Sequence, residues 1–420
     1  MSILNDGAAA TWGIAALATG GVIIRPWRLP EAVWAVLGAA ALVAFGLLSW
    51  TDALRGMQRG LDVYLFLTGM MLLAEIAQRE GLFDWLAALA VEHAHGSPQR
   101  LFTLVYLVGT VVTVFLSNDA TAIVLTPAVY AATRAAAATP LPYLFVCAFI
   151  ANAASFVLPI SNPANLVIFD GRMPHLLAWL AQFGLPSVVS IGATYLVLCL
   201  TQHKALQRER IAREVRRPEL NFCGRTAALG IGLTAITLLL FSAFGLNLGL
   251  PTFLCGCTTG AIVLVATRQA PWPLLRDISW SVLPLVAALF VLVEGLDRTG
   301  IITALNQVLR DAVDASAIGA AWAAGITVAI ASNLMNNLPA GLIAGSVIAA
   351  DHVPAHVTGA VLIGVNLGPN LSVTGSLATI LWLLALRREG HDVSAWRFLR
   401  LGLIVMPPAL ILSVSGVISL

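Results

Sequence analysis

Apolar stretches long enough to cross a lipid bilayer recur from one end of the chain to the other. Stretches of ordinary length lie at 9–24, 31–50, 60–78, 185–201, 226–245, 249–267, 279–296 and 399–418. Roughly 18 or more consecutive apolar residues can cross the hydrocarbon core as a helix. Four further apolar regions lie at 101–133, 141–170, 317–350 and 357–386. At ~1.5 Å per residue, each is too long for a single span. The pattern predicts an all-α polytopic membrane protein.

Polar and helix-breaking residues interrupt each of the four long regions. The interruptions lie at Ser117 to Asp119, Pro159 to Asn165, Asn336 to Pro339 and Gly368 to Ser376. A backbone that leaves the helix inside a bilayer is tolerated only where it lines a protein-buried or watery cavity. One interruption alone can be a simple Pro or Gly kink. Four at matching places in two halves favour one shared cavity near the membrane midplane.

The two halves of the chain carry matching residues. Leu73, Glu75, Arg79, Gly81, Leu116, Asn118 and Asn152 match Leu292, Glu294, Arg298, Gly300, Leu334, Asn336 and Asn366. If 101–133 and 317–350 are re-entrant hairpins and 141–170 and 357–386 are broken helices, each half crosses the membrane five times. An odd number of crossings inverts the second copy, which gives the inverted-topology repeat of secondary transporters. We therefore predict about ten spans plus two hairpins, with repeats at 1–201 and 226–420.

Composition and charge agree with a membrane protein and suggest its orientation. Hydrophobic residues make up 59% of the chain and charged residues 10%, whereas a soluble domain carries about 25% charged residues. The net charge of +2 argues against a nucleic-acid partner. The interval 202–225 is rich in Lys and Arg, so the positive-inside rule makes it a cytoplasmic linker and places both termini in the periplasm. Arg55 and Arg59 fall on the opposite side and disagree with this orientation.

Amide and hydroxyl side chains dominate the interruptions, and none of them contains Lys or Arg. Such groups suit a small neutral polyol or a cation better than a dianion. The substrate-binding candidates are Ser117, Asn118, Ser161, Asn162, Asn165, Asn336, Asn337, Asn370, Thr374 and Ser376.

Asp119 is the only acidic residue in an interruption. An Asp at membrane depth costs about 2.5–3.5 kcal/mol on insertion scales, so it is a functional candidate by default. We expect Asp119 to carry the proton in a coupled exchange. The structural alternative is a carboxylate that caps the helix after the hairpin tip.

Other ionisable residues receive structural interpretations. Glu75 with Arg79, and Glu294 with Arg298, have the i, i+4 spacing of a helix-surface ion pair. Cys255 and Cys257 are expected to be small core residues, and no metal site or organic cofactor is predicted. An intramembrane protease would place Ser–His, paired Asp or H-E-x-x-H at membrane depth, and no histidine lies in any interruption. A transporter is therefore favoured over an enzyme, and a channel would not need inverted halves.

Four segments make the chain resemble the arsenite efflux permeases (ArsB) within the wider ion-transporter superfamily, which includes dicarboxylate and citrate carriers. They are FLSNDATAIVLTP (115–127), FIANAASFVLPISNPANLVIF (149–169), SNLMNNLPAGLIAG (332–345) and LGPNLSVTGSLATILWLLAL (367–386). The resemblance implies ten spans, two re-entrant hairpins and an elevator-like movement of the site in the bacterial inner membrane. It also implies export of arsenite and antimonite as neutral hydroxides in exchange for protons. A homodimer and a soluble ATPase subunit are the partners implied.

This chain departs from the ArsB pattern at three positions. Asn152 and Asn366 stand where that family typically carries Asp, and Asn370 stands where it carries Lys. The losses leave Asp119 as the main acid. The alternative function is a sodium- or proton-coupled carrier of another small ion, because amides and carbonyls at broken helices also coordinate Na⁺.

Overall fold

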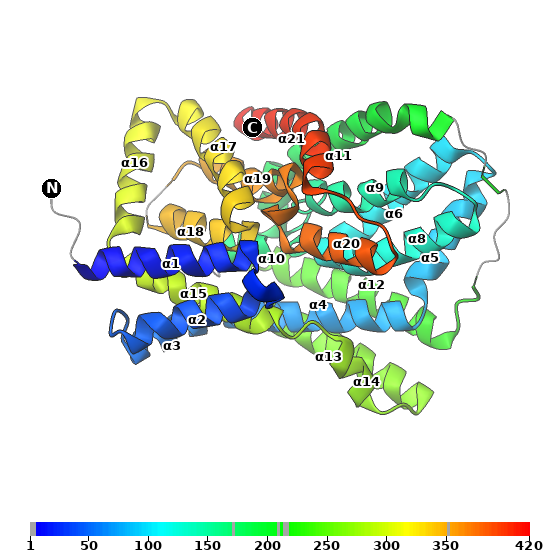
Figure 1. The fold of residues 1–420 in the computed structure, drawn as a ribbon, viewed down its shortest axis with the longest axis horizontal. Helices are drawn as coiled ribbons and strands as arrows, with labels where there is room; N and C mark the ends of the chain where they lie inside the picture. The colour runs from blue at the N-terminus through cyan, green and yellow to red at the C-terminus, as the bar shows by residue number, and fades with distance from the viewer. Residues whose placement is uncertain (1–5, 170–172, 208–210, 213–217, 351–352) are drawn as a thin grey trace.

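The computed structural model describes residues 6–169, 173–207, 211–212, 218–350 and 353–420, and the regular elements in this part of the chain are all helical (Figure 1). The helices of the first half are α1 (Asp6–Ile24), α2 (Glu31–Ala44), α3 (Trp50–Arg59), α4 (Leu61–Arg79), α5 (Leu82–Ala94), α6 (Pro98–Phe115), α7 (Asn118–Ala120), the π-helical turn η2 (Thr121–Leu125), α8 (Thr126–Ala135), α9 (Leu141–Ala153), the 3-10 turn η3 (Pro159–Ser161), α10 (Pro163–Phe169) and α11 (Leu176–Gln207). Residues 208–210 and 213–217, which hold most of the basic side chains of the predicted linker, lie outside the described residues.

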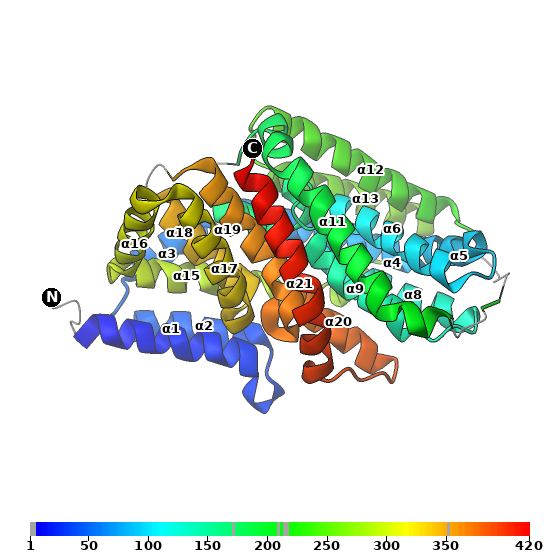
Figure 2. The ribbon, with the colours of Figure 1, turned by 90° about the horizontal axis from the view of Figure 1, so that it is seen from above.

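The second half repeats the succession of long and interrupted helices. Its elements are α12 (Phe222–Ala243), α13 (Gly249–Thr267), α14 (Pro271–Asp277), α15 (Val282–Arg298), α16 (Ile301–Ala315), α17 (Ala317–Met335), α18 (Asn337–Ala349), α19 (Ala355–Leu367), the 3-10 turns η4 (Gly368–Leu371) and η5 (Val373–Gly375), α20 (Leu377–Arg388) and α21 (Ala395–Ile418). Thus α15 to α21 follow one another much as α4 to α11 do. The helices α11 and α21 lie side by side across one face (Figure 2).

Seven helices in the described residues are long and apolar enough to cross a membrane, namely α4, α6, α11, α12, α13, α17 and α21. An eighth is counted if α14 and α15, which are bent by 46° at Ile278–Ser281, form one broken span. The expected span at 279–296 corresponds to α15, and the break at Ile278–Ser281 directly before it was not predicted from hydropathy. The protein is a multi-pass, all-helical membrane protein.

Both predicted helix-surface ion pairs are confirmed, and each recruits an Asp from the other half of the chain. Arg79 Nε lies 2.8 Å from Glu75 Oε1, and Arg79 also contacts the carboxylate of Asp277. Arg298 Nε lies 3.4 Å from Glu294 Oε1, and its Nη2 lies 2.7 Å from Asp52 Oδ1.

The two arginines that disagree with the positive-inside rule also take part in ion pairs. Arg55 Nη1 lies 3.1 Å from Asp52 Oδ1, and Arg59 Nη1 lies 3.5 Å from Glu294 Oε2. These ion pairs lie within α3 and between α3 and α15.

A close helix contact supports α4, which lines the cavity described below. The glycines Gly69 of α4 and Gly256 of α13 let the two backbones approach: a Cβ on Gly256 would lie 2.7 Å from the carbonyl oxygen of Gly69. We expect Gly256→Ala to lower the free energy of unfolding by about 1–3 kcal/mol, the cost of overpacking a tight contact. Thermal unfolding in detergent measures this loss.

Gly232→Ala in α12 is the matched control, because nothing lies within 4 Å of its added Cβ. An equal effect of both substitutions would contradict the packing explanation.

Candidate functional site

The helices are interrupted in all four long apolar regions. We number the interruptions in chain order: the first is Leu116–Ser117, between α6 and α7, and the second is 154–162, between α9 and α10. The third is Asn336, between α17 and α18, and the fourth is 368–376, between α19 and α20. Each interruption exposes backbone groups that need partners, and nearby polar side chains supply many of them.

At the first and third interruptions, polar side chains cap the helix that follows. Ser117 Oγ accepts a hydrogen bond from Ala120 N at 3.2 Å, and Asn118 Oδ1 accepts one from Asp119 N at 3.0 Å. Asn336 has a φ of 75°, and its Oδ1 accepts from Leu338 N at 3.3 Å. The sequence left open whether Asp119 caps this helix, and in the structure Ser117 is the N-cap.

A buried amide network joins the second and fourth interruptions reciprocally. In one direction, Asn366 of α19 binds the second interruption: Asn162 Nδ2 donates to Asn366 Oδ1 at 2.7 Å, and Asn366 Nδ2 donates to Asn165 Oδ1 at 2.9 Å. In the other, Asn152 of α9 binds the fourth: Asn152 Nδ2 donates to Asn370 Oδ1 at 3.0 Å. Each half thus holds the broken helix of the other.

Serines and backbone carbonyls complete this network. Ser376 Oγ donates to Asn152 Oδ1 at 3.3 Å, and Ser155 Oγ donates to Asn366 Oδ1. Asn165 Nδ2 donates to Ser155 O at 2.9 Å, and Asn370 Nδ2 donates to Phe149 O at 3.1 Å. These side chains are almost completely buried. Buried amides satisfied in this way fix the relative position of two backbone breaks.

The fourth interruption is also tied to α17 through Asn333. Asn333 Nδ2 donates to Gly368 O at 2.8 Å, and Asn333 Oδ1 accepts from Ser372 Oγ at 2.7 Å. Thr374 Oγ1 donates to Asn333 O at 3.1 Å. At the second interruption, Ser161 Oγ donates to Val114 O of α6 at 3.0 Å.

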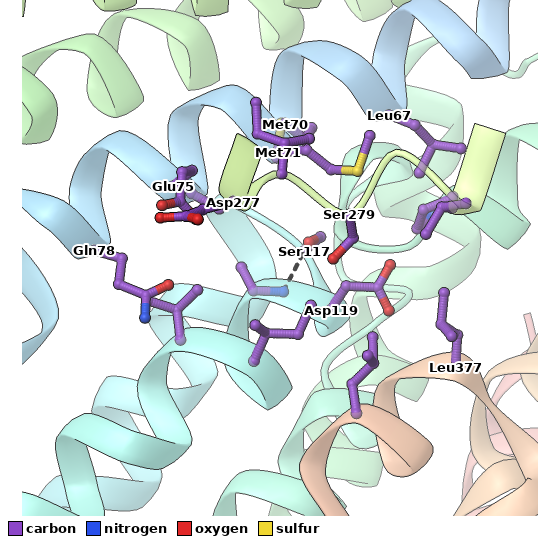
Figure 3. A pocket seen from close by; sticks show the side chains of 18 of the residues that line it. Leu67, Met70, Met71, Glu75, Gln78, Ser117, Asp119, Asp277, Ser279 and Leu377 are labelled. Carbon is purple, nitrogen blue, oxygen red and sulfur yellow. Dashed lines mark hydrogen bonds between the residues drawn. The ribbon is translucent and has the colours of Figure 1, made fainter. Parts of the chain in front are cut away.

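A cavity of about 70 Å³ lies beside the first interruption (Figure 3). Its walls come from α4, α7, η2, the first residue of α10, the α14–α15 break and the start of α20. Asp119 is half-buried and faces this cavity, and no described residue forms a hydrogen bond or ion pair with its carboxylate. A carboxylate without a protein partner is free to bind a solute or a proton.

Negative charge prevails around this cavity. Asp119, Glu75 and Asp277 line it, whereas no Lys or Arg does so among the described residues. Arg79, which contacts both Glu75 and Asp277, is the cation beside the rim, and its single charge faces two carboxylates. An anionic solute would meet repulsion here, while a neutral or cationic solute would not.

The structure divides the predicted site residues into two groups. Ser117 and Asp119 line the cavity. The others, which do not line it, are Asn118, Ser161, Asn162, Asn165, Asn336, Asn337, Asn370, Thr374 and Ser376. Asn162, Asn165, Asn370 and Ser376 belong to the buried network, and Asn118, Ser161, Asn336 and Thr374 bond locally or to a neighbouring helix.

Several residues outside the predicted set take part in this arrangement. Asn333 and Ser155 lie in the recognised segments, but inside or next to regular helix, so they did not stand out as interruption residues. Ser279 and Asp277 line the cavity from the α14–α15 break. No sequence signal identifies these two, because their place in the same cavity as Asp119 depends on packing between the halves.

Comparisons with known proteins identify the class to which this chain belongs. The family model described as citrate transporter (CitMHS) matches residues 17–368. The chain is similar to an arsenical pump membrane protein of Escherichia coli, with 24% identity over 407 residues, 94% of this chain and 95% of the relative. It is also 27% identical over 359 residues to the arsenical pump membrane protein of Escherichia coli strain K12, covering 83% of each chain.

Among solved structures, the fold is similar to that of the Alcanivorax borkumensis YdaH transporter. The TM-score is 0.58 at 13% identity, over 88% of this chain and 87% of the other. The helices, the cavity and these relatives together define a multi-pass membrane transporter. The chain belongs to the citrate transporter (CitMHS) family.

Proposed function

We propose that the protein exports arsenite or antimonite, as neutral hydroxides, in exchange for protons across the bacterial inner membrane. The single observation that carries this proposal is the Asp119 carboxylate, which faces a cavity without Lys or Arg and lacks a partner among the described residues. Relatives named arsenical pump membrane protein align over most of the chain. The hydroxyls of As(OH)3 can donate hydrogen bonds to a carboxylate without bringing charge into the cavity.

Exchange follows from the chemistry of one carboxyl group. An ionised Asp119 accepts hydrogen bonds from a bound hydroxide, whereas a protonated one loses acceptor capacity and becomes a donor. Proton binding therefore weakens solute binding at the same group, and the two ligands alternate. No redox centre or organic cofactor is part of this proposal, and the proton is the coupling ion.

The proposed architecture is an inverted repeat of two five-span halves with re-entrant hairpins at 101–133 and 317–350. Two observations support it: α15 to α21 follow one another as α4 to α11 do, and Asn152 and Asn366 each bind the broken helix of the opposite half. We propose that this pair of broken helices moves with the hairpins in an elevator-like step. Periplasmic termini, a homodimer and a soluble ATPase partner complete the proposal as expectations for experiment.

A second candidate is a sodium- or proton-coupled carrier of another small ion. The family description as citrate transporter favours it, and so do the oxygen-bearing side chains of Asp119, Ser117 and Ser279 on the cavity wall. Citrate itself suits the cavity poorly, because its carboxylates would face Asp119, Glu75 and Asp277 without a lining cation.

The deciding experiment is As(III) or Sb(III) uptake into everted vesicles, in which export appears as accumulation. An interior-acid gradient of one pH unit should support roughly tenfold accumulation for one proton per neutral solute at zero membrane potential, because one unit corresponds to ~1.4 kcal/mol. A protonophore should abolish this accumulation, and vesicles without the protein provide the control.

Metalloid accumulation driven only by a sodium gradient would replace the proton by sodium as the coupling ion. Absence of metalloid uptake by folded protein would refute the arsenite assignment.

A further inference from the structure

The α14–α15 break forms the cavity wall that faces Asp119. Ile278 and Ser279 belong to this break, between the end of α14 at Asp277 and the start of α15 at Val282. This short stretch of non-helical backbone lines the cavity. The break is thus a fifth interruption, and it lies in the second half of the chain while Asp119 lies in the first.

Ser279 has its hydroxyl available at this wall. Ser279 and Asp119 both line this cavity (Figure 3). Ser279 is half-buried, and its hydroxyl forms no hydrogen bond with any described residue. Ser117, which also lines the cavity, differs because its Oγ accepts from Ala120 N. The two half-buried polar groups without a protein partner on the cavity wall are therefore Asp119 and Ser279.

An ion-pair cluster holds the break against α4. Arg79, near the C-terminal end of α4, contacts the carboxylate of Asp277 and donates to the backbone oxygen of Pro273, both in α14. Its Nε also lies 2.8 Å from Glu75 Oε1 on α4 itself. Arg79 thus connects the two helices at the rim of the cavity.

We propose that Ser279 is a solute-binding residue that works opposite Asp119, so that one solute contacts both halves of the protein at once. This inference rests on the proposed function for the identity of the solute, a neutral poly-hydroxide. A serine hydroxyl both donates and accepts, so it can bond a solute hydroxyl whatever the protonation state of Asp119. Ser279 keeps its hydrogen bond to the solute while Asp119 takes up or releases its proton.

The kinetic test compares substitutions at neighbouring serines of the same break. Ser279→Ala should raise KM for Sb(III) or As(III) uptake about fivefold, the effect of losing one neutral hydrogen bond, with little change in Vmax. Ser279→Thr, which keeps the hydroxyl, should recover most of the loss. Ser281→Ala is the matched control, because Ser281 is exposed, lies outside the cavity lining and caps no backbone group with its side chain. An unchanged KM in Ser279→Ala would overturn the inference while leaving the proposed function intact.

A second measurement tests the inference without measuring solute transport. The double variant Asp119→Cys with Ser279→Cys should be cross-linked by a short bifunctional methanethiosulfonate, detected as one bridged peptide pair by mass spectrometry. The double variant Asp119→Cys with Ser281→Cys should not form the bridge. If the bridge forms at position 279 although the wild type transports no metalloid, positions 119 and 279 still face each other across a binding cavity for another solute, and only the proposed function fails. Absence of the bridge would show that positions 119 and 279 do not face each other across the cavity, and would refute the inference.

Discussion

Asp119→Asn is expected to abolish pH-gradient-driven accumulation of As(III) in everted vesicles, which is the loss of the roughly tenfold accumulation that one pH unit supports. The amide has the size of the carboxyl group but cannot take up or release a proton. The carboxylate of Asp119 faces the cavity, and Ser117 already caps the helix that begins at Asn118. The substitution should therefore remove coupling without unfolding the first interruption.

Downhill exchange of As(III) separates coupling from binding in this variant. An Asn at position 119 still accepts one hydrogen bond, so exchange without a gradient should persist with weakened affinity. Asp314→Asn is the matched control, because Asp314 is exposed on α16 and does not line the cavity. Full accumulation in Asp119→Asn would assign coupling to another group and leave Asp119 a structural role.

Restoring the charges of the ArsB pattern at positions 152 and 370 should show strong coupling between the two sites. Asn152 Nδ2 donates to Asn370 Oδ1 at 3.0 Å, so an amide pair stands where that pattern has Asp and Lys. Asn152→Asp or Asn370→Lys alone places an unpaired charge among fully buried groups. Each should lower the free energy of unfolding by about 3–5 kcal/mol. The double variant should recover a large part of this loss, because the two charges meet.

Thermal unfolding of the four proteins in detergent, analysed as a double-mutant cycle, measures this coupling. Asn247→Asp is the control, because Asn247 is exposed and a surface substitution usually changes stability by about 0.5 kcal/mol or less. A double variant whose destabilisation equals the sum of the single variants would mean that the side chains do not meet. Recovery would explain two of the three departures from ArsB, at positions 152 and 370, as a paired replacement that leaves the net charge of the pair unchanged.

Local patterns determined much of the fold. Hydropathy identified a polytopic helical protein, because a bilayer leaves few ways to satisfy the backbone. Proline, glycine and asparagine marked the places where the four long regions leave the helix. The i, i+4 spacing also placed Glu75 beside Arg79, since residues four apart share one helix face. Each of these signals depends only on residues that lie close together in the sequence.

Tertiary structure decided which polar residues face each other and which face the cavity. The amides of Asn162 and Asn165 looked like ligands from sequence, but they bind Asn366, which is about 200 residues away in the chain. Asp277 meets Arg79 and Ser279 faces the Asp119 cavity only because the second half packs against the first. The sequence by itself therefore determined the class of protein, the helices and most of the positions where they break. The partners across those breaks were decided by packing, because contacts between distant segments leave no periodic trace in the chain.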